Sequence, residues 1–262
     1  MSHSTMKQYD LIVIGAGPAG EKAAVKAAYF GHKVAIIDKS PSLGGAAVNT
    51  GTLPSKTLKE TALFLSGKYE KELYKLDQTL SETATIDDFL HAKDTIISSE
   101  AQEILENIIR HKVDLYTGDA KFIDANHVEI LENDKQTKIQ GTHTIIATGS
   151  YPYQPKVIPF DNNRVHDSDS ILNIDRFPKS LCVIGAGVIG CEYCTIFSTM
   201  GVKVHLVNAY DVVLPFLDQE IANGLVKQMR KDDIKIHFNT KMKAIKAPEN
   251  NKEAIEIELQ TR

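Results

Sequence analysis

Two short stretches, GAGPAG at 15–20 and GAGVIG at 185–190, carry glycines at the spacing of a dinucleotide-binding turn. In such a turn the first glycine allows a tight bend, the second lets a pyrophosphate approach the backbone, and the third lets a helix pack closely on a strand. The N–H groups at the start of that helix, with its partial positive charge, then bind the phosphates. The candidate glycines are Gly15, Gly17, Gly20, Gly185, Gly187 and Gly190.

The elements around both turns repeat as well. LIVIGAGPAG at 11–20 aligns with LCVIGAGVIG at 181–190, and GHKVAIID at 31–38 aligns with GVKVHLVN at 201–208, in one register. Each copy has the pattern of a strand, a glycine turn, a helix and a second strand, which is a βαβ unit. A single G-x-G-x-x-G can be a structural turn, but two copies in the same context favour two nucleotide sites.

The residue that ends the second strand bears on which nucleotide binds. Asp38 ends it in the first copy, where a carboxylate accepts hydrogen bonds from ribose hydroxyls and suits FAD or NAD. Asn208 takes the same place in the second copy, and its uncharged amide does not exclude NADP. The segment NAYDVV at 208–213 has no Arg or Lys to bind a 2′-phosphate, so specificity for NADPH has little support.

Composition and charge point to a globular protein that binds small molecules. The chain is 42% apolar and 24% charged, and 30 basic against 34 acidic residues give a net charge of −4, so nucleic acid and anionic membranes exert no general attraction. The first residues lack an export signal, and no apolar run approaches the ~20 residues of a membrane span, so we expect a cytoplasmic protein. The chain has three cysteines, an odd number, so we expect that no disulfide framework holds it together.

Helices and a hairpin are predicted between the two copies. Residues 57–111 are expected to be helical, with a short helix at 58–65 and a longer one at 85–112, where Thr85 and Asp88 fit a capping box. Apolar residues near one face of the longer helix indicate a core rather than a binding groove. These residues are Phe89, Ile96, Ile97, Ile104, Leu105 and Ile108.

The residues after this helix predict strands and then a connector. Alternating residues from 113 to 141, broken by Asn-Asp, indicate a strand followed by a hairpin. The stretch TIIATGSYPYQP at 144–155 is typical of an apolar strand that runs into a proline-punctuated connector. Residues 234–262 add further strands after the second βαβ unit.

The stretch GGAAVNTGTLPSK at 44–56 resembles a redox-active motif without its sulfurs. In the pyridine nucleotide-disulfide oxidoreductases, a family of flavoproteins with two dinucleotide-binding domains, the motif reads Gly-Gly-Thr-Cys-x-Asn-x-Gly-Cys-x-Pro-Ser-Lys. Here Ala47 and Thr52 stand at the cysteine positions. The chain resembles this family over essentially its whole length, and its soluble pyridine nucleotide transhydrogenases most closely, since these also carry Thr at the second position. Ala47 departs from that subgroup, which retains the first cysteine.

The resemblance implies an α/β fold with two Rossmann-like units on parallel sheets, the first with a helical insertion and a β-hairpin. We predict an FAD-binding domain at 1–150, a connector at 151–178 and an NAD(P)-binding domain at 179–262, incomplete at its carboxyl end. Family members continue further, through the rest of the nucleotide domain and a dimer interface. The chain is therefore expected to be a fragment or a truncated form of an enzyme that is a homodimer at full length.

The resemblance also implies which residues contact the cofactors. The glycines of the first turn approach the FAD pyrophosphate and those of the second hold NAD(H) or NADP(H), while Asp38 and Asn208 lie at the riboses. Further FAD contacts are implied for Lys39, Gly44, Gly45, Ala120, Thr148 and Gly149.

Lys56 and Glu192 are the predicted catalytic pair. In the resembling fold they meet near flavin N5, where an ammonium stabilises negative charge on the reduced flavin and the carboxylate holds the lysine. Either residue alone would be interpreted as a solvated surface charge, but both lie in matching motifs.

Loss of both cysteines excludes disulfide reduction by the usual dithiol relay. The resemblance implies hydride transfer between NADPH and NAD through flavin, in a ping-pong cycle. Three alternatives remain open: an NAD(P)H:quinone or oxygen oxidoreductase, a protein like dihydrolipoamide dehydrogenase without the disulfide, and a non-catalytic remnant that binds FAD or a nucleotide.

Two further patterns are interpreted as structural. CEYC at 191–194 has redox spacing, but it begins the helix after the second glycine turn, where small apolar residues pack well. The nine histidines show no metal-ligand spacing, so no metal site is expected.

Overall fold

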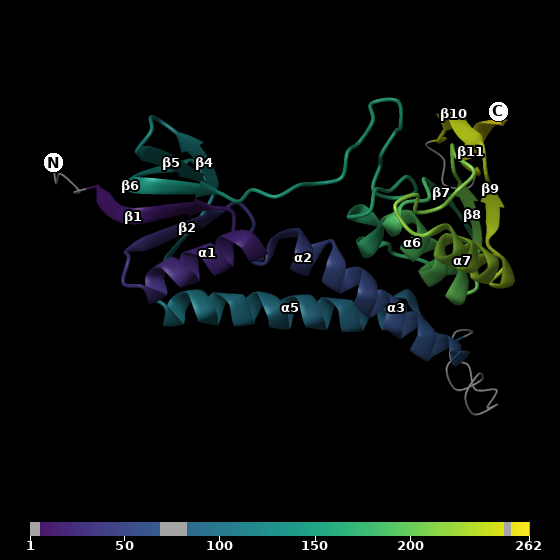
Figure 1. The fold of residues 1–262 in the computed structure, drawn as a ribbon, viewed down its shortest axis with the longest axis horizontal. Coiled ribbons are helices and arrows are strands. Elements are labelled where there is room, and N and C mark those ends of the chain that lie inside the picture. Colours follow the sequence, from purple (N-terminus) through teal and green to yellow (C-terminus); the bar gives the residue numbers. More distant parts are fainter. Residues whose placement is uncertain (1–5, 69–82, 249–252, 262) are drawn as a thin grey trace. The chain divides into compact units, whose positions relative to one another are not determined.

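A computed structural model of the chain describes residues 6–68, 83–248 and 253–261 (Figure 1). Contacts divide it into two compact units. Unit 1 comprises Met1–Pro54 and Asp94–Tyr151, and unit 2 comprises Ser55–Lys93 and Pro152–Arg262. Residues 55–93 of the predicted first domain therefore belong to unit 2. The predicted limits of the FAD-binding domain, the connector and the NAD(P)-binding domain concern function and remain predictions.

Unit 1 is built on a six-stranded sheet with the order β3-β2-β1-β6-β5-β4. β1 pairs in parallel with β2 and β6, and β2 with β3, whereas β4, β5 and β6 pair antiparallel. The strands are β1 (Lys7–Ile14), β2 (Val34–Asp38), β3 (Asp114–Thr117), β4 (Asp119–Phe122), β5 (His127–Glu132) and β6 (Lys135–Ile146). The prediction of a parallel α/β unit that carries a β-hairpin is confirmed.

Strand β6 takes part in both kinds of pairing, antiparallel with β5 and parallel with β1. The turn before it consists of Asn133 and Asp134, whose φ angles of 44° and 66° are the left-handed conformation that a two-residue hairpin needs. The sequence separated the hairpin from the apolar strand at 144–146, and the structure joins them through Gly141. A Cβ at Gly141 would lie 2.7 Å from Cδ1 of Ile12, so this glycine makes room for a neighbouring strand and does not end its own.

The sheet of unit 1 has a core on each face, because successive residues of a strand point to opposite sides. Val13 faces the core that is covered by α1 (Pro18–Tyr29) and by the last part of α5 (Ile86–Arg110). Ile12 faces the other core, which β5 and β6 complete. Both residues are fully buried, which explains why the second half of β1, residues 11–14, is a continuous apolar run.

Unit 2 contains the second βαβ unit. Its parallel sheet has the order β7-β8-β9, and β10 and β11 form a separate antiparallel pair. One apolar core unites α6 and α7 with α3, the start of α5 and the 3-10 helix η1. The elements are α3 (Thr52–Ser66), η1 (Ser170–Asn173), β7 (Ser180–Ile184), α6 (Val188–Thr199), β8 (Lys203–Val207), α7 (Gln219–Lys231), β9 (Lys235–His237), β10 (Thr240–Lys246) and β11 (Glu256–Thr261).

Both predicted helices of the insertion are present, with different limits. α3 begins at Thr52 rather than at Leu58, because Pro54 falls in its first turn, where the missing N–H of proline costs no hydrogen bond. The capping box before α5 is confirmed: the Thr85 N–H donates to Asp88 at 2.8 Å, and the Asp88 N–H donates to the Thr85 hydroxyl at 3.2 Å. Residues 69–82 of the predicted helical region lie outside the described residues.

The apolar face of α5 contributes to two different cores. Phe89 is fully buried in the core of unit 2, and Ile108 is fully buried in a core of unit 1, where Ile104 and Leu105 pack beside it. The prediction that this face is a core is confirmed at these four positions. Helical periodicity predicts which residues share a face, but it does not tell which core that face enters.

Two histidines on neighbouring strands of unit 2 should make the stability of this unit depend on pH. His205 of β8 and His237 of β9 have nearly parallel rings, and Nδ1 of His205 lies 3.1 Å from Nε2 of His237. Burial, and then the charges of His237 and Lys235, lower the pKa of His205 below 6.5.

Because this folded-state pKa is depressed, the pair stabilises the fold above pH 6.5, and this contribution is lost as the pH falls through the lowered value. We expect the free energy of unfolding, measured with urea from pH 7.5 to pH 5, to decrease in that window. His205→Gln should flatten this part of the curve. An identical curve for the variant would contradict the assignment.

Candidate nucleotide-binding sites

The first glycine turn connects β1 to α1 in unit 1, as predicted. Gly15 has a φ of +104°, and a Cβ there would lie 2.2 Å from the carbonyl oxygen of Ala147. A Cβ at Gly20 would lie 1.8 Å from the carbonyl oxygen of Gly15. Gly17 is the N-cap residue of α1 and has no side chain to bind the first N–H groups of the helix. The first N–H groups of α1 therefore have no side-chain cap, and they lie beside a space that side chains at Gly15 and Gly20 would disrupt.

The stretch at 44–56 borders this turn closely. The Gly44 N–H donates to the carbonyl oxygen of Ala16 at 3.0 Å, and a Cβ at Gly45 would lie 2.8 Å from Cα of Gly17. Gly44 has a φ of +96° and precedes the short helix α2 (Gly45–Asn49). The structure thus brings the predicted Gly44 and Gly45 against the first turn, within unit 1.

Asp38 organises the same turn from the end of β2. Its carboxylate accepts hydrogen bonds from the N–H of Ala16 at 2.6 Å and from the N–H of Ser40 at 2.8 Å. A carboxylate has about four acceptor positions, so it keeps capacity for ribose hydroxyls. Lys39 follows it and is exposed. The predicted contacts of Asp38 and Lys39 with FAD remain predictions.

Asn49 is a residue of this site that the list of candidates missed. Its amide group donates to the carbonyl oxygens of Leu43 at 3.0 Å and Gly45 at 2.9 Å, and its oxygen accepts from the Ser42 hydroxyl at 2.6 Å. Asn49 therefore fixes the loop that carries Gly44 and Gly45. Its match to the family motif was the available signal.

Asn49→Ala is expected to destabilise unit 1 by about 1–3 kcal/mol, because it removes the partner of three carbonyl groups and one hydroxyl. FAD affinity should fall as well, since Gly45 packs against Gly17. Thermal unfolding and FAD fluorescence titration measure the two effects. If both values match those of the wild type, Asn49 has no such role.

The other predicted FAD contacts in unit 1 are Ala120, Thr148 and Gly149. Thr148 and Gly149 follow β6 and are exposed, and the backbone nitrogen of Thr148 lies 3.2 Å from where a Cβ of Gly15 would be. Ala120 lies in β4, and the Gly118 N–H before this strand donates to the carbonyl oxygen of Asp38 at 2.9 Å. Thr148 thus borders the first turn directly, whereas no described contact joins Ala120 to it.

The second glycine turn, in unit 2, repeats the backbone of the first. Gly185 has a φ of +102°, Gly187 is the N-cap residue of α6, and a Cβ at Gly190 would lie 2.0 Å from the carbonyl oxygen of Gly185. The flanks differ, because a Cβ at Gly185 or Gly187 would have no described atom within 4 Å. The second turn is therefore more open than the first.

Asn208 plays the part in unit 2 that Asp38 plays in unit 1. Its side-chain oxygen accepts from the N–H of Ala186 at 3.4 Å, and its amide group donates to the carbonyl oxygens of Tyr210 at 3.1 Å and Val212 at 2.8 Å. The side chain is buried and holds the turn and the loop after β8 together. Both amide hydrogens are used, so only the oxygen has capacity left for a ribose hydroxyl, and that contact remains a prediction.

Lys56 and Glu192 both lie in unit 2, on α3 and α6. Lys56 is exposed and Glu192 is half-buried. Within the part of the chain that the structure describes, no hydrogen bond or ion pair joins them. The electrostatic influence of Glu192 is instead found at Lys59, one turn after Lys56 on α3. The predicted pairing of Lys56 with Glu192 remains a prediction.

The two cysteines of CEYC are packed in the core of unit 2. Cys191 and Cys194 are 4% and 0% exposed, and burial raises the pKa of Cys191 and raises that of Cys194 to about 12. Both are free thiols. Among the described residues, no group of three or more His, Cys, Asp or Glu side chains is arranged to hold a metal ion. No helix of the described ranges is both long and apolar enough to cross a membrane.

A protein-family model matches a part of the chain that contains both glycine turns. Residues 9–261 match the model of a family described as pyridine nucleotide-disulphide oxidoreductase. The chain belongs to this family. It is 39% identical over 243 residues to a soluble pyridine nucleotide transhydrogenase of Mycobacterium bovis (strain BCG / Pasteur 1173P2). The aligned residues cover 92% of this chain and 52% of that relative. A protein of the same name from Serratia proteamaculans is 38% identical over 244 residues, covering 93% and 52%.

Two solved structures have the same fold as this chain. The HOCl-induced flavoprotein disulfide reductase RclA from Escherichia coli superimposes with a TM-score of 0.79 at 25% identity, covering 97% of this chain and 55% of its own. LpdA from Mycobacterium tuberculosis has the same fold, with a TM-score of 0.85 at 21% identity and coverage of 97% and 55%. The chain spans about half the length of the curated relatives it matches.

Proposed function

We propose that unit 1 binds FAD, that unit 2 binds NAD(H) and NADP(H), and that the protein transfers hydride from NADPH to NAD. The observation that carries the proposal is the pair of glycine turns with equivalent backbone conformations, each followed by a helix whose first N–H groups have no side-chain cap. The 39% identical relative is named for transhydrogenation, which supports this activity over others of the family.

The first turn fits the pyrophosphate of a dinucleotide. A side chain at Gly15 or Gly20 would meet backbone atoms, so the surface there consists of backbone, and the start of α1 supplies the N–H donors. Asp38 would accept hydrogen bonds from the adenosine ribose. When bound, FAD supplies a ring that accepts and donates hydride.

The stretch that carries thiols in related enzymes supplies none here. Ala47 in α2 and Thr52 in α3 cannot pass electrons to a disulfide substrate. A nucleotide substrate needs no such relay. The second turn would bind NADPH, release NADP and then bind NAD. The ammonium of Lys56, which is exposed, would stabilise negative charge on the reduced flavin.

Absorbance spectroscopy tests the proposal. Purified chain supplied with FAD should be yellow, lose its visible absorbance under anaerobic titration with NADPH, and regain it on addition of NAD. A protein that takes up no FAD would overturn the proposal. Bleaching that is reversed by a quinone or by oxygen but not by NAD would replace transhydrogenation with the quinone or oxygen activity, and FAD uptake without bleaching would leave a non-catalytic binding protein.

A further inference from the structure

Glu21 has a buried carboxylate near the start of α1, the helix whose first N–H groups are proposed to bind the FAD pyrophosphate. The residue is 2% exposed and directly follows Gly20, the third glycine of the first turn. Its backbone N–H donates to the carbonyl oxygen of Gly17 at 2.9 Å, which closes the first turn of the helix. A buried charge is costly unless it is paired, so the partners of this carboxylate indicate its role.

The side chain of Glu21 joins α1 to α5. Oε1 accepts a hydrogen bond from the side-chain amide of Asn107 at 2.5 Å, and Oε2 forms an ion pair of 2.9 Å with Lys22. A hydrogen bond to an ionised group is roughly twice as strong as one between neutral groups. Glu21 and Asn107 both belong to unit 1, where α1 and the last part of α5 lie side by side over one core (Figure 1).

Helix α5 also borders the loop at Gly44, which lies against the first glycine turn. Cδ1 of Ile104 lies 3.0 Å from where a Cβ of Gly44 would be. Ile104 and Asn107 are three residues apart and therefore lie on one face of the helix. This face of α5 thus contacts the loop at Gly44 and holds the start of α1 through Glu21.

The negative charge of Glu21 is offset where it lies. The ammonium group of Lys22 pairs with the carboxylate from the solvent side, since its side chain is 76% exposed and that of Glu21 is 3% exposed. The partial positive charge at the start of α1 favours the carboxylate as well. A pyrophosphate bound at this helix end would therefore meet little net repulsion from Glu21, and the hydrogen bond to Asn107 is the effect that remains.

We propose that Glu21 is a positioning residue of the FAD site in unit 1. Its hydrogen bond to Asn107 fixes the first turn of α1 against α5, in the orientation in which the N–H groups of that turn bind the pyrophosphate. This inference rests on the proposed function, in which unit 1 binds FAD. A turn that is free to tilt would bind the pyrophosphate with fewer of its N–H groups.

FAD affinity, measured on the purified chain by quenching of flavin fluorescence, tests this role. Glu21→Ala and Asn107→Ala should each weaken FAD binding about tenfold, because each removes a hydrogen bond to a charged group. The double variant should bind no more weakly than either single variant, since both changes remove the same bond. Glu21→Gln should bind within about twofold of the wild type, because its side-chain oxygen still accepts from Asn107.

Ile130→Val is the matched control for a loss of stability. Ile130 is 2% exposed in the core on the other face of the sheet, so this variant destabilises unit 1 without changing α1 or α5. Its FAD affinity should equal that of the wild type. The role would be overturned by equal weakening in Ile130→Val and Glu21→Ala, by a Glu21→Gln variant as weak as Glu21→Ala, or by wild-type affinity in Asn107→Ala.

Hydrogen exchange tests the fixed turn in the chain without FAD. The amide of residue 21, followed by mass spectrometry, should exchange about tenfold faster in Glu21→Ala and Asn107→Ala than in the wild type, because the turn opens more often. Glu21→Gln and Ile130→Val should keep the wild-type rate. Equal rates in Asn107→Ala and the wild type would contradict the positioning.

Two further observations keep the outcomes distinct. A circular dichroism melt identifies misfolded protein, and Asn107→Ala, which changes a half-buried residue, replaces Glu21→Ala if that variant does not fold. If the wild type takes up no FAD, the proposed function fails, and the exchange rates still decide whether Glu21 fixes the turn.

Discussion

Gly20→Ala is expected to weaken FAD binding by unit 1 about 100-fold and to leave nucleotide binding by unit 2 unchanged. The added Cβ would lie 1.8 Å from the carbonyl oxygen of Gly15, a backbone atom of the turn itself. Relief of this contact must move the turn or α1, at a cost of about 3 kcal/mol. That cost corresponds to about 100-fold weaker binding. FAD fluorescence quenching and calorimetric titration with NADH measure the two affinities.

Two other glycines provide matched controls. Gly190→Ala should have the reverse effect, loss of NADH binding with FAD retained, because its Cβ would lie 2.0 Å from the carbonyl oxygen of Gly185. Gly224→Ala in α7 should change neither affinity, since a Cβ there would have no described atom within 4 Å. Loss of both ligands in Gly20→Ala, with an intact melting transition, would show that the two turns are not separate sites.

Lys56→Met is expected to slow the reduction of bound flavin by NADPH about 100-fold, the usual order for removal of one preorganised electrostatic group. The lysine is exposed and has no hydrogen bond or ion pair among the described residues, so its loss should leave the fold of unit 2 intact. FAD affinity should remain close to that of the wild type, because the first turn lies in unit 1. Anaerobic stopped-flow absorbance measures the rate.

The matched control for this variant is Lys227→Met, which removes one exposed positive charge from α7 of the same unit. Its rate of flavin reduction should equal that of the wild type. Similar slowing in both variants would point to a general loss of attraction for the anionic nucleotide. An unchanged rate in Lys56→Met would remove this lysine from the mechanism.

Local signals in the sequence predicted much of the fold. The glycine turns were predictable because the first glycine of each turn has a positive φ, and because a side chain on the third, Gly20 or Gly190, would meet the backbone of the turn. The hairpin was predictable because Asn133 and Asp134 tolerate positive φ. The start of α3 was predicted at Leu58 instead of Thr52, and β6 was divided into a hairpin strand that ended at Gly141 and an apolar strand from Thr144. A proline in a first helical turn and a glycine that faces a neighbouring strand interrupt nothing.

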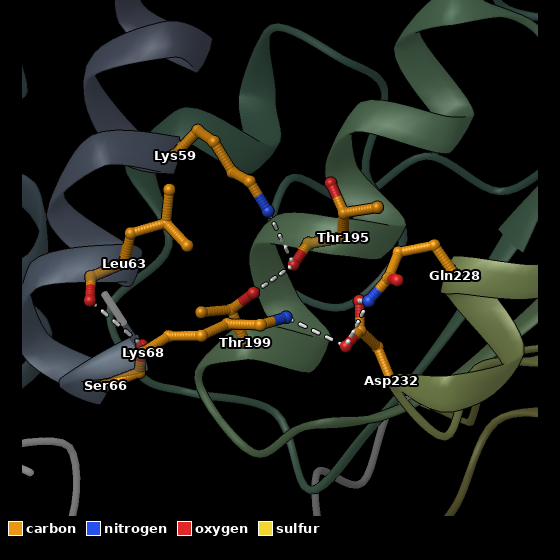
Figure 2. Close-up of polar contacts among 8 residues, drawn as sticks. All are labelled: Lys59, Leu63, Ser66, Lys68, Thr195, Thr199, Gln228 and Asp232. Carbon is orange, nitrogen blue, oxygen red and sulfur yellow. Dashed lines mark hydrogen bonds and ion pairs between the residues drawn. The ribbon is translucent and has the colours of Figure 1, made fainter. Parts of the chain in front are cut away.

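The hydrogen-bond partners of some side chains depend on tertiary packing and could not be predicted from the sequence. The ribose contact of Asn208 remains a prediction, and the sequence did not indicate that its amide group binds two backbone carbonyls of its own loop. Lys59 belongs to no motif of the sequence, and its hydrogen bond to Thr195 follows from the packing of α3 on α6 (Figure 2). The resemblance to a family predicted roles for residues that match its motifs, and it predicted none for the residues between the motifs.

The burial of Cys191 and Cys194 should make this protein resistant to inhibitors that react with thiols. Arsenicals and organomercurials inactivate enzymes by capturing accessible thiolates, and a close dithiol is their best target. Here Ala47 and Thr52 remove that target, and the raised pKa values of the two packed thiols leave almost none of them ionised at neutral pH. The NADPH oxidation that we propose for this protein should therefore persist at doses of phenylarsine oxide that inactivate an enzyme with an accessible dithiol.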